Sequence, residues 1–226
     1  KILRMDMDTV RQRGGHEKIL NKFSNKEADI LLGTQMIAKG LDFDNVTLVG
    51  VINADSGLFF PDFRAGERVF QLIYQVSGRA GRRKKQGMAI IQTYNSNDIY
   101  IRTASSLNTN QFYNIAMAQR QELNYPPFSR IGRIILKGIN KKNVNDLANK
   151  LFNQLQSNEE FHIMGPAPAP IEKIKGMWRT HIIIKSIDKE NKTISRFIFE
   201  KIGFSIFEKK INGVKVILDV DPISMM

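Results

Sequence analysis

The sequence is organised around one stretch, Gln75-Val76-Ser77-Gly78-Arg79-Ala80-Gly81-Arg82. Apolar residues in and before it recur at i, i+3, i+4 and i+7, which predicts a helix with one apolar stripe. Gln75, Arg79 and Arg82 repeat with helical spacing on a different face. Gly78 removes bulk beside the arginines and lets the backbone turn out of the helix. The stretch therefore predicts a glutamine and two arginines presented together at a helix end.

Two arginines in this arrangement suit a polyphosphate ligand. Each forked guanidinium can bind two phosphate oxygens and keeps its charge throughout the physiological range. The alternative is a solvated basic helix end, because cations are favoured at the carboxyl end of a helix dipole.

The composition is that of a basic chain able to bury hydrophobic cores. Its 226 residues are enough for one large or two modest domains, and 42% of them are hydrophobic. The formal net charge is +12, and the excess is shared as +5 over residues 1–125 and +7 over residues 126–226. A charge of this size indicates a nucleic-acid partner, with a basic protein that binds none as the alternative.

Some classes of site are disfavoured by what the sequence lacks. There is no cysteine, so it has no disulfides and no thiolate metal site. The histidines His16, His162 and His181 lack the spacing of a zinc site, so we expect no metal site built within this chain. No apolar run reaches the roughly 18 residues that predict a membrane span. The chain opens at Lys1 without an initiator methionine, which we interpret as a piece of a longer protein.

The first half of the sequence predicts an α/β fold. Apolar runs at 1–5, 28–32, 46–52 and 88–93 predict strands. Helical patterns lie between or after them, at 17–23, 67–77, 99–106 and 111–123. Strands that alternate with helices in this way indicate one parallel sheet with helices on both faces.

A long loop, 53–66, is rich in aromatic residues. Phe59, Phe60 and Phe63 lie in it beside Arg64. Exposed rings beside an arginine could stack on nucleic-acid bases, or the rings could pack beneath the loop. Both interpretations stay open at this point.

A break at 125–127, Tyr-Pro-Pro, predicts a boundary between a domain 1–125 and a second domain 126–226. Beyond it the element order is β-α-β-β-α-β, typical of a small split βαβ domain. The elements are expected at 131–137, 144–155, 162–164, 178–185, 194–202 and 214–220. The run 165–170, Gly-Pro-Ala-Pro-Ala-Pro, predicts a stiff extended linker.

A second motif, G-T-Q-M-I-A-K-G-L-D at 33–42, follows a predicted strand. Ligands gather at the carboxyl ends of strands in open α/β sheets. Thr34 and Gln35 can offer a hydroxyl, an amide and backbone N–H groups to a phosphodiester. Gly40 permits close backbone approach, and Asp42 could orient a water or accept from a ribose or an arginine. A capping threonine beside an exposed lysine and aspartate is the alternative.

A phosphate loop of the form G-x₄-G-K-[ST] is absent from the sequence. The strand 46–52 leads to Asp55, as in a magnesium-binding motif, but there is no phosphate loop for it to serve. We therefore interpret Asp55 as structural or loop-ordering. A chain with arginines for a nucleoside triphosphate but no cradle for it predicts the second of two lobes.

The order of these motifs resembles the second RecA-like lobe of a superfamily-two helicase. The motifs are T-Q-M-x-A-K-G-x-x-F at 34–43, D-F-R-A-x-E-R at 62–68 and Q-V-x-G-R-A-G-R at 75–82. Further segments resemble the primosomal protein N′ (PriA) family of replication-restart helicases over nearly the whole chain. These segments are 3–9, 125–127, 164–169, 178–179 and 218–222.

The resemblance implies an ATP-dependent 3′-to-5′ DNA helicase that recognises stalled forks and D-loops and assembles the primosome. Arg79 and Arg82 would contact the γ-phosphate, one of them as the arginine finger, and Gln75 would couple the nucleotide to the interlobe contacts. Further nucleotide-binding positions would be Gly40, Asp42 and Gly78. DNA-binding positions would be Thr34, Gln35 and Lys39. Residues 126–226 would be a DNA-binding domain similar to ribosomal protein S10.

The resemblance also implies cofactors and partners. ATP and Mg²⁺ would be bound mainly by the other lobe, and zinc by another part of the full protein. The partners would be branched and single-stranded DNA, single-strand DNA-binding protein and primosome proteins. A monomer in the bacterial cytoplasm, with no membrane contact, is expected.

Two alternatives to this assignment remain from the sequence. One is another superfamily-two translocase, such as a branch-migration or RNA helicase, and another is a nucleic-acid binding module without motor activity. Whether the full protein is the replication-restart helicase or another translocase, we expect this chain alone to be inactive as an ATPase. The family's basic and aromatic run around Trp178 and Arg179 departs here at Met177, Thr180 and His181, so the contact with single-strand DNA-binding protein is not carried over to these residues. The lone Trp178 is either a core residue or a ring that stacks on a base or binds a partner.

Overall fold

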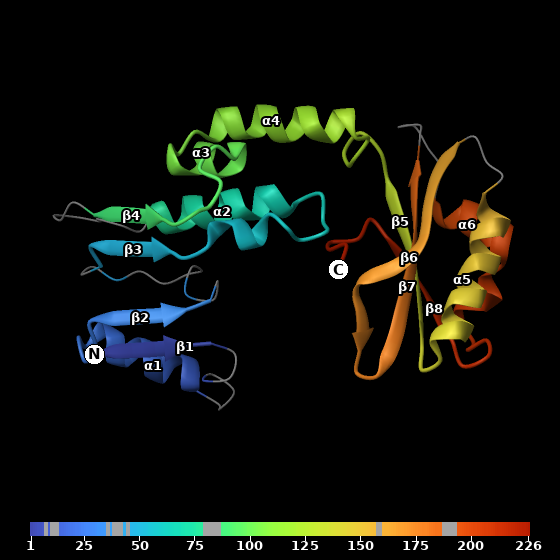
Figure 1. The fold of residues 1–226 in the computed structure, drawn as a ribbon, viewed down its shortest axis with the longest axis horizontal. Coiled ribbons are helices and arrows are strands. Elements are labelled where there is room, and N and C mark those ends of the chain that lie inside the picture. The colour runs from blue at the N-terminus through green and yellow to red at the C-terminus, as the bar shows by residue number, and fades with distance from the viewer. Residues whose placement is uncertain are drawn as a thin grey trace. The chain divides into compact units, whose positions relative to one another are not determined.

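The computed structural model describes residues 1–6, 9, 14–34, 37, 43, 46–78, 87–156, 160–186 and 194–226. They form two compact units, each built around its own strands (Figure 1). The first unit comprises residues 1–60 and 64–113, and the second comprises 61–63 and 114–226. None of the helices in the described ranges has the length and apolar character that crossing a membrane requires.

The strands of the first unit form two parallel pairs. β1 (Ile2–Met5) pairs with β2 (Ile30–Gly33), and β3 (Leu48–Val51) pairs with β4 (Met88–Ile91). The predicted parallel strands are thus confirmed. Over the described ranges the two pairs are separate sheets, so the single sheet with helices on both faces stays a prediction.

The helices of the first unit fall where the apolar periodicity places them. They are α1 (Gly15–Ser24), the 3₁₀ helix η2 (Ala54–Gly57), α2 (Ala65–Ser77), α3 (Ile99–Ser105) and α4 (Thr109–Glu122), which continues into the second unit. The predicted stripe of α2 is buried at Val69, Ile73 and Val76, and Phe70 joins it by stacking on Phe112 with ring centroids 3.7 Å apart. α2 packs on β3, β4 and α3 through this stripe.

The second unit has the predicted order β-α-β-β-α-β. Its elements are β5 (Ile131–Gly138), α5 (Lys141–Leu155), β6 (Phe161–Ile174), β7 (Met177–Ser186), α6 (Ile194–Ile202), the 3₁₀ helix η3 (Phe204–Phe207) and β8 (Lys215–Val220). The four strands form one antiparallel sheet in the order β6-β7-β5-β8. β7 therefore separates β5 from β6.

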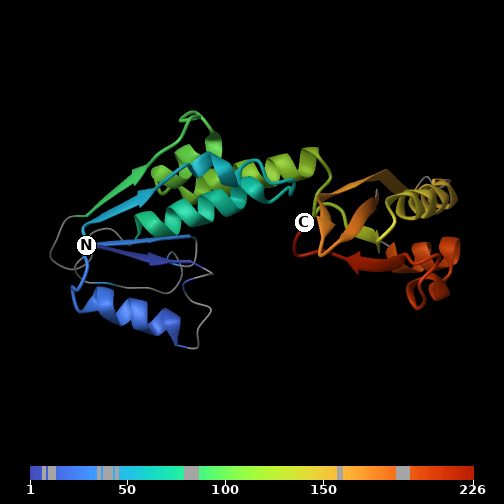
Figure 2. The same cartoon turned by 60° about the horizontal axis from the view of Figure 1, so that its bottom comes forward.

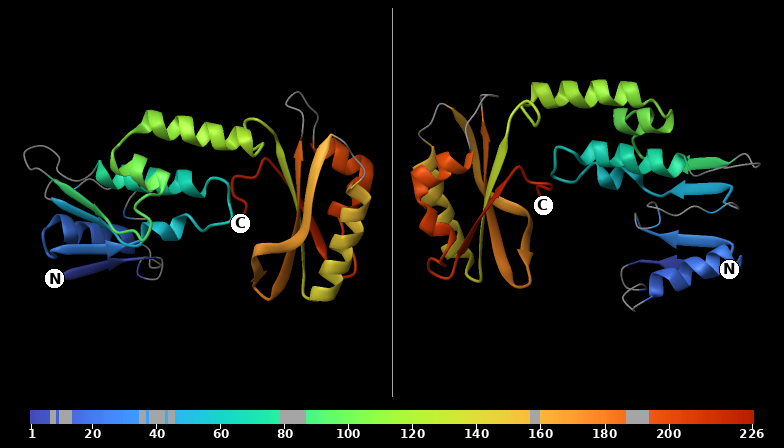
Figure 3. Two further views of the ribbon diagram at one scale, coloured as in Figure 1. Left: turned by 45° about the horizontal axis from the view of Figure 1, so that its top comes forward. Right: turned by 180° about the vertical axis from the view of Figure 1, so that it is seen from behind.

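The core of the second unit lies between one sheet face and the helices α5 and α6 (Figures 2 and 3). Even-numbered residues of β5 and β7 point into it, because side chains alternate between the faces of a strand. Ile134, Leu136 and Ile182 are fully buried there. The odd-numbered residues point to the other face, which neither α5 nor α6 covers and on which no further helix of the second unit lies in the described ranges.

The prediction of a linker at 165–170 is wrong. β6 runs through it, and Ala167 pairs with His181 and Pro168 with Thr180 on β7. β6 lies at the edge of the sheet, where a proline can sit with its missing N–H turned away from the neighbouring strand. The prolines therefore shape an edge strand, with register shifts on either side of the Ala167–Pro168 pairs.

Candidate functional site

Gln75 lies in the last turn of α2 with its side chain exposed. The helix ends as predicted, and the N–H of its capping residue Gly78 donates to the carbonyl of Tyr74 at 3.1 Å. Gly78 has φ −68°, a value that any residue adopts. The prediction that the helix end needs the backbone freedom of a glycine at this position is therefore wrong. Gln75 is thus presented to solvent at the point where the chain leaves the helix.

Thr34 follows β2 directly and is exposed. Its carbonyl accepts from the N–H of Ile37 at 3.1 Å, so the motif begins with a turn. Gly33 allows close packing at this point, since a Cβ there would lie 2.5 Å from the backbone oxygen of Met5 on β1 and 2.8 Å from the side chain of Ile37. Gly33 is a positioning residue that the sequence reading passed over, although a glycine ending a strand in front of a motif was a usable signal.

Thr34 and Gln75 lie at opposite edges of the strands. β2, β3 and β4 point the same way (Figures 1 and 3). Thr34 follows the carboxyl end of β2. α2 returns from the carboxyl end of β3 toward the amino end of β4, so its last turn lies near the amino edge. The described parts of the two motifs are therefore placed for two ligands or two parts of one large ligand.

The other predicted site residues lie outside the described residues. They are Arg79, Arg82, Gly40, Asp42, Gln35 and Lys39. Next to them, Phe43 is described and meets Phe23 of α1 edge to face, with ring centroids 4.9 Å apart. This contact holds the last residue of the 34–43 motif against α1.

Asp55 orders a loop, as predicted. Its buried carboxylate accepts from the hydroxyl of Thr93 at 2.8 Å and from the N–H of Tyr94 at 2.9 Å. A third hydrogen bond comes from the N–H of Asn95 at 3.2 Å. Burial alone would raise the pKa of Asp55, but the hydrogen bonds together outweigh it and the pKa is lowered.

The described residues do not fit a metal ion. Both oxygens of Asp55 are engaged by donors from the chain, so this carboxylate is a poor Mg²⁺ ligand. In the described ranges, no three His, Asp or Glu side chains are grouped to hold a metal. Any Mg²⁺ that accompanies a nucleotide would need ligands from elsewhere.

The rings of the aromatic loop 53–66 differ in their surroundings, and each of the two interpretations fits one of them. Phe59 is 82% exposed, so its ring is open to a stacking partner. Phe63 instead packs within the second unit, stacked on Tyr125 with ring centroids 4.5 Å apart. One ring of the loop is therefore structural and another is available for contact.

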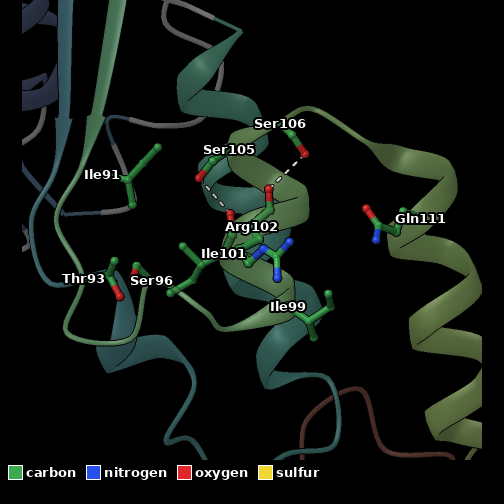
Figure 4. A pocket seen from close by; sticks show the side chains of 9 residues that line it. All are labelled: Ile91, Thr93, Ser96, Ile99, Ile101, Arg102, Ser105, Ser106 and Gln111. Carbon is green, nitrogen blue, oxygen red and sulfur yellow. Dashed lines mark hydrogen bonds between the residues drawn. The ribbon is translucent and has the colours of Figure 1, made fainter.

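A cavity of about 500 Å³ lies between the end of β4, α3 and α4 (Figure 4). The lining residues are Ile91, Thr93, Ser96, Ile99, Ile101, Arg102, Ser105, Ser106 and Gln111. The hydroxyls of Ser105 and Ser106 donate to helix carbonyls at 2.8 and 3.0 Å, so they are not turned toward a ligand. Of the predicted site residues that the structure describes, Thr34, Gln75 and Gly78, none lines this cavity.

The helix-free face of the second sheet is basic. Its odd-numbered positions carry one acidic residue, Asp219 on β8, against the basic residues Arg133 and Lys137 on β5, Arg179 and Lys185 on β7, and Lys215 on β8. The sequence reading missed this surface, although the signal was present as basic residues at alternate positions of two predicted strands. Such a face suits the phosphates of a nucleic acid.

Arg133 is the buried member of this face, only 4% exposed. It donates to Asp219 at 3.0 Å and to the carbonyl of Met226 at 3.1 Å. Burial lowers the pKa of the neighbouring His181, and the charges of Arg133 and Arg179 lower it further. Burial and the neighbouring cations therefore favour the neutral form of His181.

Trp178 is half-buried near the amino end of β7. The ammonium groups of Lys141 and Lys173 lie over its ring, 4.4 and 4.7 Å from the centroid. These contacts are cation–π interactions. Trp178 is therefore not a fully buried core residue, and whether its ring stacks on a base or binds a partner stays a prediction.

Comparison with known proteins matches both units. The model of the helicase conserved C-terminal domain matches residues 2–84, and that of the primosomal protein N C-terminal domain matches residues 121–223. The chain is 40% identical over 228 residues to the replication restart protein PriA of Bacillus subtilis, covering all of this chain and 28% of that protein. It is 38% identical over 217 residues to PriA of Borreliella burgdorferi, covering 95% of this chain and 30% of that protein. The chain thus spans under a third of these relatives' length.

Proposed function

This chain belongs to the PriA family of replication restart proteins, and we propose that it supplies the second lobe of an ATP-dependent DNA helicase. The full protein would move 3′ to 5′, recognise stalled forks and D-loops, and assemble the primosome. The observation that carries the proposal is the exposed end of α2, where Gln75 precedes the two arginines of the decisive stretch.

The nucleotide would lie against the amino edge of the strands. Arg79 and Arg82 would meet the γ-phosphate there, with Gln75, Gly78, Gly40 and Asp42 around them. Charge develops on the phosphoryl group during transfer, and an arginine finger is worth about 10³–10⁵ in turnover. Since the sequence has no phosphate loop, ATP and Mg²⁺ would be held mainly by residues outside this chain.

The tracking strand of DNA would lie at the opposite edge. Thr34, Gln35 and Lys39 would contact its sugar–phosphate backbone, which carries no sequence information. The separation of Thr34 from Gln75 supports this division, because nucleotide and DNA then occupy different edges of the same strands.

We further propose that the domains are 1–125, a RecA-like lobe with helices on both faces of its sheet, and 126–226, an S10-like domain that binds DNA. Single-strand DNA-binding protein and primosome proteins would be its partners, and zinc would belong to another part of the full protein. The family implies a monomer acting in the bacterial cytoplasm.

The chain alone and the full-length protein should differ in one measurement. Steady-state ATP hydrolysis is measured with and without forked DNA for both. We expect DNA-stimulated hydrolysis from the full-length protein and none from residues 1–226, because the phosphate cradle is missing. Stimulated hydrolysis by the chain alone would refute the proposal.

A second candidate is a nucleic-acid binding module without motor activity, favoured by the basic helix-free face of the second unit. In that case Arg82→Ala would weaken DNA binding and reduce its salt dependence, because the arginine would contact phosphodiester. In the motor, the same change removes turnover and leaves DNA affinity in place.

A further inference from the structure

Two exposed aromatic rings follow the carboxyl ends of a strand pair in the first unit. The last residues of β3 and β4, Val51 and Ile91, are register partners, so both strands end at the same level. The loop after β3 carries Phe59, which is 82% exposed, and the loop after β4 carries Tyr94, which is 88% exposed. Neighbouring strands lie about 4.8 Å apart, so the two loops leave the pair side by side.

Asp55 connects these two loops. Its carboxylate accepts the N–H of Tyr94 at 2.9 Å, and its backbone carbonyl accepts the N–H of Leu58, next to the first ring, at 2.9 Å. The carbonyl of Gln92 also accepts the N–H of Ala54 at 3.0 Å. The backbones that carry the two rings are therefore fixed to each other.

The base of the first ring also packs on α2. A Cβ at Gly57 would lie 2.5 Å from the side chain of Val69, so η2 approaches α2 more closely than a larger residue would allow. Val69 is only 3% exposed, and it belongs to the buried stripe of α2. A ring on such a base loses little freedom when it stacks, because its loop is ordered before a ligand binds.

The rings share an edge of the first unit with the motif proposed to contact DNA. β2, β3 and β4 point the same way, and Thr34 follows the carboxyl end of β2 (Figures 1 and 3). Ligands gather at this edge in open α/β sheets. A hydroxyl and backbone N–H groups suit the sugar–phosphate backbone of an unpaired strand, and exposed rings suit its bases.

We propose that Phe59 and Tyr94 form a stacking platform for the bases of single-stranded DNA. This inference rests on the proposed function and adds base contacts to its backbone contacts. Every base has a π face, so stacking supplies affinity without sequence preference, as a motor that moves along DNA requires. A duplex hides the faces of its bases against one another, so the platform favours an unpaired strand.

The test measures how tightly the full-length protein binds a fluorescent oligothymidylate, without ATP, by anisotropy. Phe59→Leu and Tyr94→Leu each remove a ring and keep an apolar side chain of moderate size. We expect each to weaken binding about tenfold, because each removes the stacking of one base. The slope of affinity against salt concentration should stay the same, since no phosphate contact is lost.

A second probe isolates the contribution of the bases. An abasic oligonucleotide of the same length keeps the sugar–phosphate backbone and lacks the bases. The unaltered protein should bind it more weakly than oligothymidylate, and the ratio of the two affinities should shrink about tenfold in Phe59→Leu and in Tyr94→Leu. A change confined to this ratio reports an interaction between ring and base, as in a double-mutant cycle.

Matched controls separate stacking from a general change of the surface. Tyr113 is 62% exposed in the same unit, but it lies on α4 and in neither of the two loops. Tyr113→Leu should leave the affinity for both probes unchanged. Tyr94→Phe and Phe59→Tyr keep a ring at each position, so both should bind oligothymidylate as tightly as the unaltered protein.

Three results would overturn the platform. They are unchanged affinity for oligothymidylate in both ring variants, an equal loss of affinity for the two probes, and an equal loss in Tyr113→Leu. The first of them would leave the exposed rings to a protein partner. All three leave the proposed function intact where the unaltered protein shows DNA-stimulated ATP hydrolysis. Absence of that hydrolysis overturns the proposed function separately, because the affinity measurements use no ATP.

Discussion

The two units bury their strands in different ways. In the second unit, Ile134 and Leu136 are fully buried beneath the helices that cover one sheet face. In the first unit, Ile30, Leu48 and Met88 on the parallel pairs are 53–58% exposed. Parallel strands are normally covered on both faces, so these exposed side chains depart from the usual burial of a parallel sheet, whereas the second unit covers its core with its own helices.

The comparison teaches which unit can stand alone. The second unit closes its own core between one sheet face and its helices. The first unit leaves large apolar side chains exposed on its strands, so its stability should depend on further contacts. The most direct test of this contrast truncates a buried side chain in the second unit and an exposed one in the first, and compares the loss of stability.

The largest effect is expected from Leu151→Ala on α5. Leu151 is 1% exposed, and truncating a core leucine costs about 2–5 kcal/mol. Ile30→Ala, at a side chain 53% exposed, should cost no more than about 0.5 kcal/mol. Urea unfolding followed by Trp178, the single tryptophan, reports the second unit alone, and amide exchange reports both. Equal costs at the two sites would remove the contrast between the units.

Gly33→Ala should damage the first unit selectively. The added Cβ would lie 2.5 Å from the Met5 carbonyl, a backbone atom that cannot move without breaking the β1–β2 pair. Overpacking of this kind costs about 1–3 kcal/mol. We expect faster amide exchange in β1 and β2 and an unchanged urea transition at Trp178. A shifted Trp178 transition would show that the two units unfold together.

The units should also lose stability at different pH. The pKa of His181 is lowered, so its contribution to the second unit is complete above its ordinary pKa of roughly 6.5 and is lost as the pH falls through its lower folded value. The pKa of Asp55 is lowered too, so its contribution is complete above roughly pH 4 and is lost only in more acid solution.

Two variants check this order of events. In His181→Gln the Trp178 urea midpoint should vary less between pH 7 and about 5, since the neutral amide does not titrate. In Asp55→Asn the amide of Asn95 should exchange faster at neutral pH and lose its acid dependence. If His181→Gln keeps the full wild-type pH profile, other groups govern the second unit.

A small effect is also expected from Lys173→Ala beside Trp178. One cation–π contact at a half-buried ring is worth about 0.5–1 kcal/mol. The emission of Trp178 should shift as one ammonium leaves its ring, while the fold of both units persists. An unaltered emission spectrum would mean that Lys173 does not rest on the ring in solution.

Much of this architecture could be read from the sequence, because it is encoded locally. The stripe of α2 follows from apolar spacing, and the order of the second unit follows from strands and helices with clear periods. The loop-ordering role of Asp55 followed from the missing phosphate loop, and its three hydrogen bonds agree.

The rest depends on contacts far apart in the chain. Phe63 and Tyr125 are 62 residues apart, so no local pattern could predict their stack. The run 165–170 looks like a linker because prolines usually interrupt strands, and only the edge position of β6 makes them acceptable. The basic face needed the register of β5 against β7 before its side chains could be grouped.

The measurement that tests the central claim most directly is ATP turnover and forked-DNA affinity of full-length Arg82→Ala. Arg102→Ala, at an exposed arginine of α3, serves as the control. The account predicts a loss of turnover of about 10³-fold or more with DNA affinity and its salt slope unchanged, and near-normal turnover in the control. Retained turnover together with weakened DNA binding would contradict it.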